Sequence, residues 1–178
     1  WLKQRKSPIE LVHMIRETAL FIKEHYPGLK RIGVLATDGT VKAGVYDTVF
    51  GEEGLAVIYP DPVVQKQKVH RAIYDPLYGI KASSNPVTDA ARKDIREAVR
   101  HLAGKGAECV VLGCTELPLA FISNERLSLP VIDANLALAR ALVKSAAPEK
   151  LKPLFAVTPL NPPFVKGGLR GVTAKANQ

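Results

Sequence analysis

The 178-residue sequence contains no apolar run that approaches the roughly 20 residues of a membrane-spanning helix. Its N-terminus is basic, but Ser7, Pro8 and Glu10 follow where the apolar core of a signal peptide would lie. These two absences predict a cytoplasmic protein without a membrane partner. Apolar residues make up 47% and charged residues 24% of the chain, which is normal for a soluble domain with its own core.

Cysteine and histidine are too sparse for a disulfide framework or a structural metal site. Cys109 and Cys114 are five residues apart on or beside one expected strand, a span of about 17 Å. A disulfide requires Cα atoms within about 7 Å of each other. The four histidines are scattered, without the close spacing of zinc ligands. We therefore expect reduced thiols and no metal.

The net charge of +8 lies mostly in the two ends of the chain. Lys3, Arg5 and Lys6 carry part of it, and the lysines and arginine after residue 149 carry most of the rest. Residues 7–148 are close to neutral. A nucleic-acid surface usually shows a basic patch with aromatic residues on a folded face. We expect no nucleic-acid partner.

Apolar segments alternate with helical patterns from residue 7 to residue 146. The expected strands span residues 31–37, 55–59, 109–112 and 130–133. The expected helices run from a capping box at Ser7 to Pro27, then over 40–52, 63–77, 87–103 and 134–146, with a short helix after Thr115. Alternating strands and helices form parallel sheets. The expected fold is α/β: an open, parallel, four-stranded sheet with helices on both faces.

The strand 109–112 ends at Gly113 and presents Cys114, Thr115 and Glu116 at its carboxyl end. In open α/β sheets, ligands bind outside these strand ends. We predict that Cys114 is a reactive thiol whose pKa is lowered by a following helix N-terminus and nearby amides. The alternative is a small buried side chain, the commonest fate of a free cysteine. Cys109, inside the strand, is assigned to packing.

A second candidate site lies where the strand 31–37 meets the next helix. Backbone N–H groups at such junctions bind carboxylates, and Thr37 and Thr40 add hydroxyl donors. The alternative is that Asp38-Gly39 is a plain turn and Thr40 a helix cap. Lys81 lies in the expected loop 78–86. It either reaches the site at these strand ends and pairs with a carboxylate there, or is a solvated loop lysine. His70 and His101 are assigned to surface or packing roles.

These segments resemble the aspartate/glutamate racemase family over about residues 7–146. The resemblance rests on Gly33-Val-Leu-Ala-Thr-Asp-Gly-Thr40 followed by Tyr46, on Gly79-Ile-Lys-Ala82, and most specifically on Gly113-Cys-Thr-Glu-Leu-Pro118. The resemblance implies that this chain forms one of two pseudo-symmetric α/β domains, and that the enzyme works without a cofactor. In such enzymes, a thiolate removes the α-proton of an amino acid and an opposite thiol reprotonates the other face. Cys114 would be one of these thiols; Thr37, Thr40 and Thr115 would bind the substrate carboxylate, and Glu116 would hold the ammonium group or tune Cys114.

The family's first cysteine, in a Cys-Asn-Thr motif, has no counterpart here, because no cysteine precedes Cys109. The chain therefore resembles the C-terminal half of a racemase: residues 1–6 a remnant linker, 7–147 the α/β domain, and 148–178, rich in proline and glycine, a disordered tail. The expected partners are an amino acid or dicarboxylate substrate, and either the missing N-terminal domain or a second copy of the chain. Two alternatives stay open: a single-cysteine decarboxylase or maleate-isomerase-like enzyme, and a non-catalytic relic or small-acid-binding module.

Overall fold

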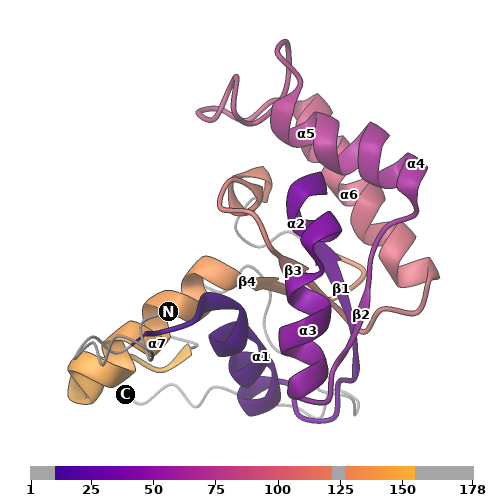
Figure 1. The fold of residues 1–178 in the computed structure, drawn as a ribbon. Coiled ribbons are helices and arrows are strands. Elements are labelled where there is room, and N and C mark those ends of the chain that lie inside the picture. The colour runs from indigo at the N-terminus through magenta and orange to yellow at the C-terminus, as the bar shows by residue number, and fades with distance from the viewer. Residues whose placement is uncertain (1–10, 122–126, 155–178) are drawn as a thin grey trace, which may run out of the picture.

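The computed structural model describes residues 11–121 and 127–154. Its centre is a parallel sheet of four strands in the order β2-β1-β3-β4 (Figure 1). The strands are β1 (Arg31–Leu35), β2 (Ala56–Ile58), β3 (Cys109–Leu112) and β4 (Val131–Asp133). The predicted α/β class, with an open, parallel, four-stranded sheet, is confirmed.

β1 and β3 form the middle of the sheet. Ile32 lies opposite Cys109, and Leu35 lies opposite Leu112. All residues of β3 are buried, as expected for a central parallel strand that is covered on both faces. Cys109 is fully buried within this strand, so its predicted packing role is confirmed.

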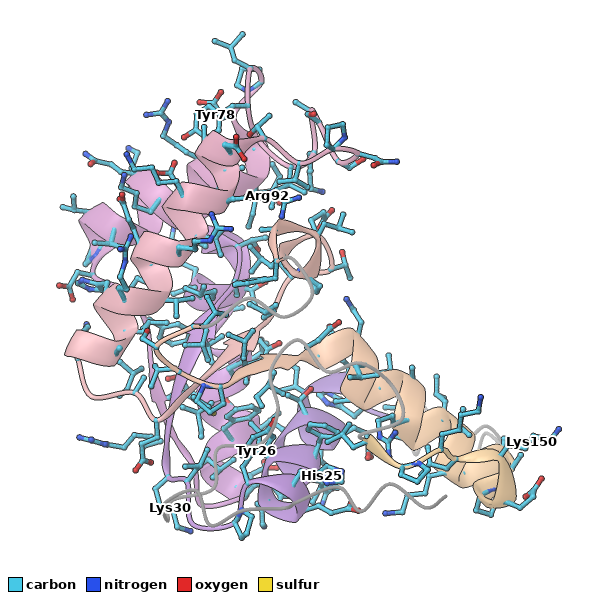
Figure 2. All side chains as sticks on the ribbon, turned by 180° about the vertical axis from the view of Figure 1, so that it is seen from behind. His25, Tyr26, Lys30, Tyr78, Arg92 and Lys150 are labelled. Carbon is cyan, nitrogen blue, oxygen red and sulfur yellow. The ribbon has the colours of Figure 1, made fainter. Side chains whose placement is uncertain are left out.

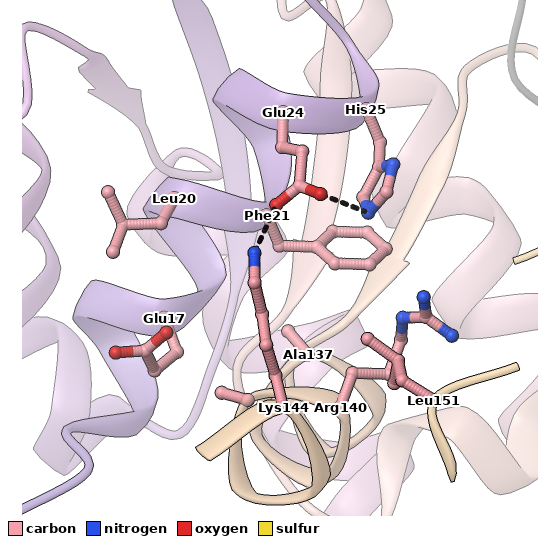
Figure 3. A pocket seen from close by; sticks show the side chains of 10 residues that line it. Glu17, Leu20, Phe21, Glu24, His25, Ala137, Arg140, Lys144 and Leu151 are labelled. Atoms are coloured by element: carbon pink, nitrogen blue, oxygen red, sulfur yellow. Dashed lines mark hydrogen bonds and ion pairs between the residues drawn. The ribbon is translucent and has the colours of Figure 1, made fainter. Parts of the chain in front are cut away.

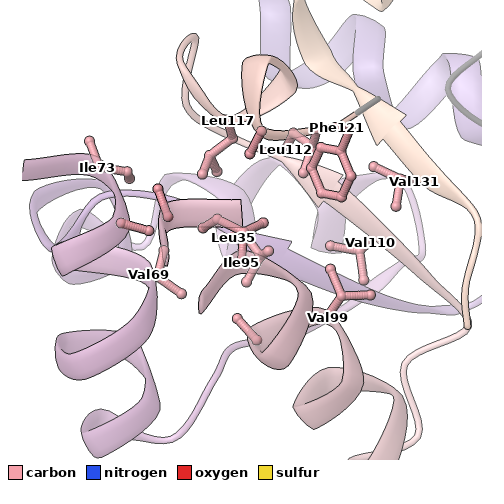
Figure 4. Packing of buried hydrophobic residues seen from close by; sticks show 14 of the residues in the cluster. Leu35, Val69, Ile73, Ile95, Val99, Val110, Leu112, Leu117, Phe121 and Val131 are labelled. Carbon is pink, nitrogen blue, oxygen red and sulfur yellow. The ribbon is translucent and has the colours of Figure 1, made fainter. Parts of the chain in front are cut away.

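Helices cover both faces of the sheet, as predicted. One face packs against α1 (Met14–His25), α3 (Val45–Glu52) and α7 (Ala134–Ala146). The other face packs against α6 (Asp89–Gly104) and against a continuous helix made of α4 (Pro62–Val64), the π-helical segment η1 (Gln65–His70) and α5 (Arg71–Tyr74) (Figure 1). Figure 4 shows the apolar layer on this second face, where Ile95 and Val99 of α6 meet side chains of the strands.

The first helix starts later than the sequence predicts. The expected cap, Ser7, lies outside the described residues, but residues 11–13 are described and are not helical. α1 begins at Met14 because the imidazole of His13 accepts the N–H of Arg16 and caps the helix. Histidine is not among the residues that normally cap a helix, so this start could not be predicted from residue type.

The second helical segment also starts at a different residue. The predicted turn at Asp38–Thr40 is the first turn of α2 (Asp38–Ala43), and Thr37, not Thr40, caps it by accepting the N–H of Thr40. Gly44, with φ of +62°, then separates α2 from α3. This left-handed conformation suits glycine and splits the single helix expected over residues 40–52 into two.

The remaining boundaries are close to those expected. The helix expected over residues 63–77 ends earlier, at Tyr74, the last residue of α5. It ends there because the Asp75 carboxylate accepts the N–H groups of Leu77 and Tyr78 and starts a turn. Residues 148–154, assigned from the sequence to the disordered tail, include a short 3₁₀ helix, η3 (Pro148–Lys150), and the buried Leu154. Residues 1–6 and 155–178 lie outside the described residues. Over the described part of the chain, no helix combines the length and apolar character needed to cross a bilayer.

Candidate active site at the carboxyl ends of β1 and β3

The candidate site lies where the chain changes direction across the sheet. From β1 the chain passes to the edge strand β2, whereas from β3 it passes to the opposite edge strand β4. Neighbouring strands whose connections leave in opposite directions form a topological switch point, the usual ligand position of open α/β sheets. The N–H of Gly113 donates to the carbonyl of Leu35 over 2.8 Å. The residues after Leu35 and after Gly113 therefore meet at one mouth, as the sequence predicts.

Glu116 links three of the predicted site residues. Its Oε2 atom accepts hydrogen bonds from the Cys114 thiol and from the Thr115 hydroxyl, each over 2.9 Å. Its Oε1 atom lies 3.0 Å from Nζ of Lys81. Lys81 thus reaches this mouth, and the carboxylate it pairs with here belongs to the protein.

The protonation states in this cluster follow from these contacts. The hydrogen bond from Cys114 and the bonds from Lys81 and Thr115 outweigh desolvation and lower the pKa of Glu116 to about 2. Burial and the Glu116 carboxylate raise the pKa of Cys114 to about 11. The Glu116 carboxylate also raises the pKa of Lys81. At neutral pH the cluster is therefore a neutral thiol, a carboxylate and an ammonium group.

The raised thiol pKa corrects the prediction that Cys114 is an activated thiolate. The backbone N–H of Glu116 does lower the pKa, as expected, and Lys81 adds to that effect. Both are outweighed, because the thiol is half-buried and donates to a carboxylate. The following element, η2 (Leu117–Ala120), is a 3₁₀ helix of four residues and brings little dipole.

η2 is fastened to the neighbouring helix α6. Nη1 of Arg92 donates to the carbonyl of Ala120 over 2.8 Å, and its Nε donates to the carbonyl of Val87. Figure 2 shows Arg92 and Tyr78 at one end of the molecule and Tyr26 and Lys30 at the other. The segment that carries Cys114 is thus anchored on both sides, by β3 before it and by Arg92 after it.

On the β1 side, two threonine hydroxyls lie together. The Oγ1 atoms of Thr37 and Thr40 are 3.0 Å apart, and both residues are partly exposed. Thr37 Oγ1 also accepts the N–H of Thr40. One hydroxyl proton of the pair remains available for an acidic ligand, which keeps the predicted carboxylate-binding role chemically possible.

Asp38, Gln65 and His70 extend this side of the mouth, and sequence reasoning gave none of them a site role. Nε2 of Gln65 donates to the carboxylate of Asp38 over 2.8 Å and to the carbonyl of Ala36 over 2.9 Å. Nδ1 of His70 lies 3.1 Å from the other Asp38 oxygen. Gln65 and His70 both belong to the π-helical segment η1, and nothing in the sequence signals that irregular turn.

Aromatic contacts connect the two sides. The rings of His70 and Tyr74 lie 4.9 Å apart, and Nζ of Lys81 lies 5.2 Å from the Tyr74 ring centre. Since Lys81 binds Glu116 and His70 approaches Asp38, polar and aromatic contacts run from the Cys114 side to the Thr37 side.

Among the described residues, three hollows elsewhere on the surface are not lined by any predicted site residue; one of these, of about 340 Å³, lies between η1 and α6 beside Lys68 and Asp94. One, of about 100 Å³, lies between α1 and α7 (Figure 3); there Glu24 pairs with Lys144 over 3.3 Å and with His25 over 3.9 Å. Another, of about 390 Å³, lies beside Tyr26 and Pro130, at the opposite ends of the strands. The switch point therefore remains the candidate site.

Comparisons with known proteins agree with the resemblance in the motifs. A family model described as Asp/Glu/Hydantoin racemase matches residues 3–142. The glutamate racemase of Limosilactobacillus reuteri (strain DSM 20016) is 28% identical over 124 residues, which make up 70% of this chain and 41% of that protein. A Pectobacterium carotovorum protein, uncharacterised and named for its place in the pnlA 3′ region, is 31% identical over 119 residues, 67% of this chain and 73% of its own length.

Solved structures give the same picture. An aspartate racemase homologue from Pyrococcus horikoshii OT3 superposes with a TM-score of 0.64 at 29% identity, over 81% of this chain and 59% of that one. The aspartate racemase of Picrophilus torridus gives 0.59 at 28% identity, over 82% and 57%. The chain thus spans little more than half of these structures and less than half of the glutamate racemase. Because the family model covers most of its length, the chain belongs to the Asp/Glu/hydantoin racemase family.

Proposed function

We propose that this chain forms one half of the active site of a cofactor-independent amino-acid racemase of the aspartate/glutamate type. The observation that carries the proposal is the position of Cys114: a thiol at the switch point, hydrogen-bonded to Glu116 and directly after Gly113, which is bonded to the last residue of β1. Family membership supports the reaction class.

Cys114 handles the proton on one face of the substrate. The α-proton of an amino acid is very weakly acidic, so its removal needs a base in contact and donors that stabilise the charge of the enediolate. With a pKa of about 11, Cys114 rests as a thiol and is poised to donate a proton. In the opposite direction the thiolate removes the proton. Cys109 is buried in β3, so the second proton carrier comes from another segment of the enzyme.

The threonine hydroxyls hold the substrate carboxylate. Thr37 and Thr40 supply this contact from the β1 side. Thr115 joins them when the substrate competes with Glu116 for its hydroxyl proton. Glu116 is occupied by the thiol and by Lys81, which supports its role in tuning Cys114 more than a role in holding the ammonium group.

A second domain, or a second copy of the chain, covers this mouth in the working enzyme. Leu77, in the turn before Lys81, is 90% exposed, and Leu119, shortly after Glu116, is half exposed. Tyr74, which faces Lys81, is also exposed. Exposed apolar side chains around a polar site are typical of an interface.

The test is α-proton exchange in D₂O, followed by NMR, with L- and D-aspartate and L- and D-glutamate. We expect exchange with the chain and with Cys109→Ser, and none with Cys114→Ser. Equal loss in both variants, or exchange that persists in Cys114→Ser, overturns the assignment of Cys114. A folded chain that exchanges neither enantiomer is not a catalyst by itself and favours the small-acid-binding alternative.

One observation favours a second candidate, a decarboxylase or isomerase that uses a single cysteine. A thiol that rests protonated suits the one-sided protonation of a carbanion, and the chain offers one cysteine outside its core. A screen of substituted malonates and maleate separates this candidate from the racemase. Turnover of a malonate without α-proton exchange of amino acids would decide for it.

A further inference from the structure

Helix α2, which follows the cap Thr37 on the β1 side of the candidate site, has no side chain in the core. None of its six residues is buried. Its second residue, Gly39, has no side chain to restrict the backbone. Val41, further along the helix, is only partly buried, against the core under α1 and α3. Packing therefore does little to fix the first turn, where Thr37 and Thr40 lie.

Gln65 supplies an anchor for this turn. It is the first residue of η1 and is 7% exposed. Its Nε2 atom donates to the carbonyl of Ala36 over 2.9 Å and to the carboxylate of Asp38 over 2.8 Å. One amide group thus binds the residues on both sides of Thr37. Among the described residues, every hydrogen bond and ion pair that joins residues 36–40 to another element comes from η1.

The orientation of the Gln65 amide follows from these two partners. Both partners are acceptors, so the NH₂ group faces them and the oxygen Oε1 lies on the other side. Oε1 is buried and accepts no hydrogen bond from the described residues. A buried acceptor without a donor costs stability, and such a group in a folded protein calls for an explanation. A role at the neighbouring site supplies one.

We propose that Gln65 is a positioning residue for Thr37, whose amide fixes the Thr37 and Thr40 hydroxyl pair in the geometry that binds the substrate carboxylate. The proposal rests on the carboxylate-binding role proposed above for this pair. The two hydroxyl oxygens are 3.0 Å apart. Groups that bind a ligand must be held within about 0.5 Å of the right geometry, and hydrogen-bonded residues behind them do so. Both amide protons of Gln65 are used on Ala36 and Asp38, so it acts on the hydroxyls through the chain.

Backbone amide hydrogen exchange, followed by NMR in the chain without ligand, measures this positioning directly. The N–H of Val41 donates to the carbonyl of Thr37 over 3.0 Å and closes the first turn of α2. We expect Gln65→Met, which keeps a side chain of similar size but donates nothing, to speed exchange at Val41 about tenfold or more. The N–H of Thr48, which donates to the Gly44 carbonyl over 3.1 Å, closes the first turn of α3. It is the matched amide and should change less than about twofold.

Gln67→Met is the matched variant. Gln67 lies in the same segment η1, two residues further on, and is exposed. We expect Gln67→Met to leave exchange at Val41 unchanged. An unchanged rate at Val41 in folded Gln65→Met, or an equal increase at Val41 and Thr48, overturns the proposal. If Gln65→Met does not fold, Gln65→Asn carries the same test, because its amide is one carbon shorter and falls short of the two partners.

A second readout separates positioning from a general loosening of the fold. In a Cys109→Ala chain, which leaves Cys114 as the single thiol, L-aspartate bound at the mouth should slow alkylation by iodoacetamide. The aspartate concentration that halves the rate reports the affinity. We expect Gln65→Met to raise this concentration about threefold to tenfold, while the rate without aspartate stays within about twofold of the parent. A loosened fold would instead expose the half-buried Cys114 and speed alkylation without aspartate.

The two readouts also distinguish this proposal from the proposed function. If Gln65→Met speeds exchange at Val41 but aspartate does not protect even the parent chain, Gln65 fixes Thr37 and the racemase assignment fails. If aspartate protects the parent and Gln65→Met equally well, the proposed function stands and the role of Gln65 is withdrawn.

Discussion

The Cys114 sulfur lies 2.9 Å from a carboxylate oxygen of Glu116, two residues further along the chain. The contact stabilises the protonated form of Cys114 and the ionised form of Glu116, so the pKa of Cys114 rises and that of Glu116 falls. A thiol held in this way is a better proton donor than nucleophile at neutral pH. Its reactivity depends on the charges of Glu116 and Lys81, and each can be removed separately.

Glu116→Gln is expected to make Cys114 more reactive. The glutamine carries no charge, so both the carboxylate hydrogen bond and the repulsion that raise the thiol pKa are lost. Burial of the sulfur stays, so the pKa falls only part of the way to its ordinary value. We expect iodoacetamide alkylation at pH 8, in the Cys109→Ala chain, to be about tenfold faster. Glu97→Gln removes an equal charge from α6, where Glu97 pairs with Lys68 of η1, and should leave the rate unchanged; a similar increase in both variants would contradict the prediction.

Lys81→Met should have the opposite sign. The ammonium group favours the thiolate and neutralises Glu116, so its removal raises the pKa of Cys114 further. Because about half of the Lys81 side chain is exposed, we expect a modest effect, an alkylation rate about twofold to fivefold lower at low salt. The difference from the parent chain should shrink in about 0.5 M NaCl, where exposed charges are screened. Faster alkylation in Lys81→Met would rule out this account.

Glu116 should make folding stability depend on acid pH. Its pKa is about 2 in the folded chain, below the ordinary 4.5. A lowered carboxyl pKa contributes stability that is complete above about pH 4.5 and is lost as the pH falls towards 2. Urea unfolding at pH 6 and pH 3 is the measurement. The parent chain should lose more free energy of unfolding between the two values than Glu116→Gln does, and equal losses would refute the assignment.

Gly113→Ala should destabilise the fold through Tyr46. The new methyl group would lie 2.8 Å from the tyrosine hydroxyl, and we expect a loss of about 1–3 kcal/mol in the free energy of unfolding. Combining it with Tyr46→Phe removes the nearest atom, so the two changes should cost less than their sum. Gly51→Ala, in the same helix as Tyr46 and with open space around it, is the control and should be neutral or stabilising. Additive losses in the double variant would show that the contact is not the cause.

The sequence predicted the sheet well because the signal there is strong. Each of the four strands is an apolar run between turn residues, and α7 was expected over the residues it occupies. Helix starts were less predictable. His13 and Thr37 cap α1 and α2, whereas Ser7 and Thr40 carried the expected signals, because a cap is decided by one local hydrogen bond.

At the candidate site, the contacts between the predicted residues could not be read from the sequence. Lys81 and Glu116 are 35 positions apart, and only the folded chain brings them to 3.0 Å. The direction of the Cys114 pKa shift depends on that arrangement and on burial, so the sequence alone suggested the wrong sign. Gln65 had no signal of its own, because an ordinary polar residue acquires such a role only through its tertiary position.

The π-helical turn η1 makes helix length matter at this site. Gln65 and His70, its first and last residues, both approach Asp38, although they are five positions apart. A π turn pairs residues five apart, whereas an α-helix aligns residues three or four apart. In a regular α-helix of unchanged length, residues five apart point about 140° away from each other, so one of the two would turn away from Asp38. Deleting one residue between them puts the partners four apart, the spacing that a regular α-helix aligns. In related chains, a one-residue gap within this helix should therefore accompany the loss of the π turn while both partners of Asp38 are retained.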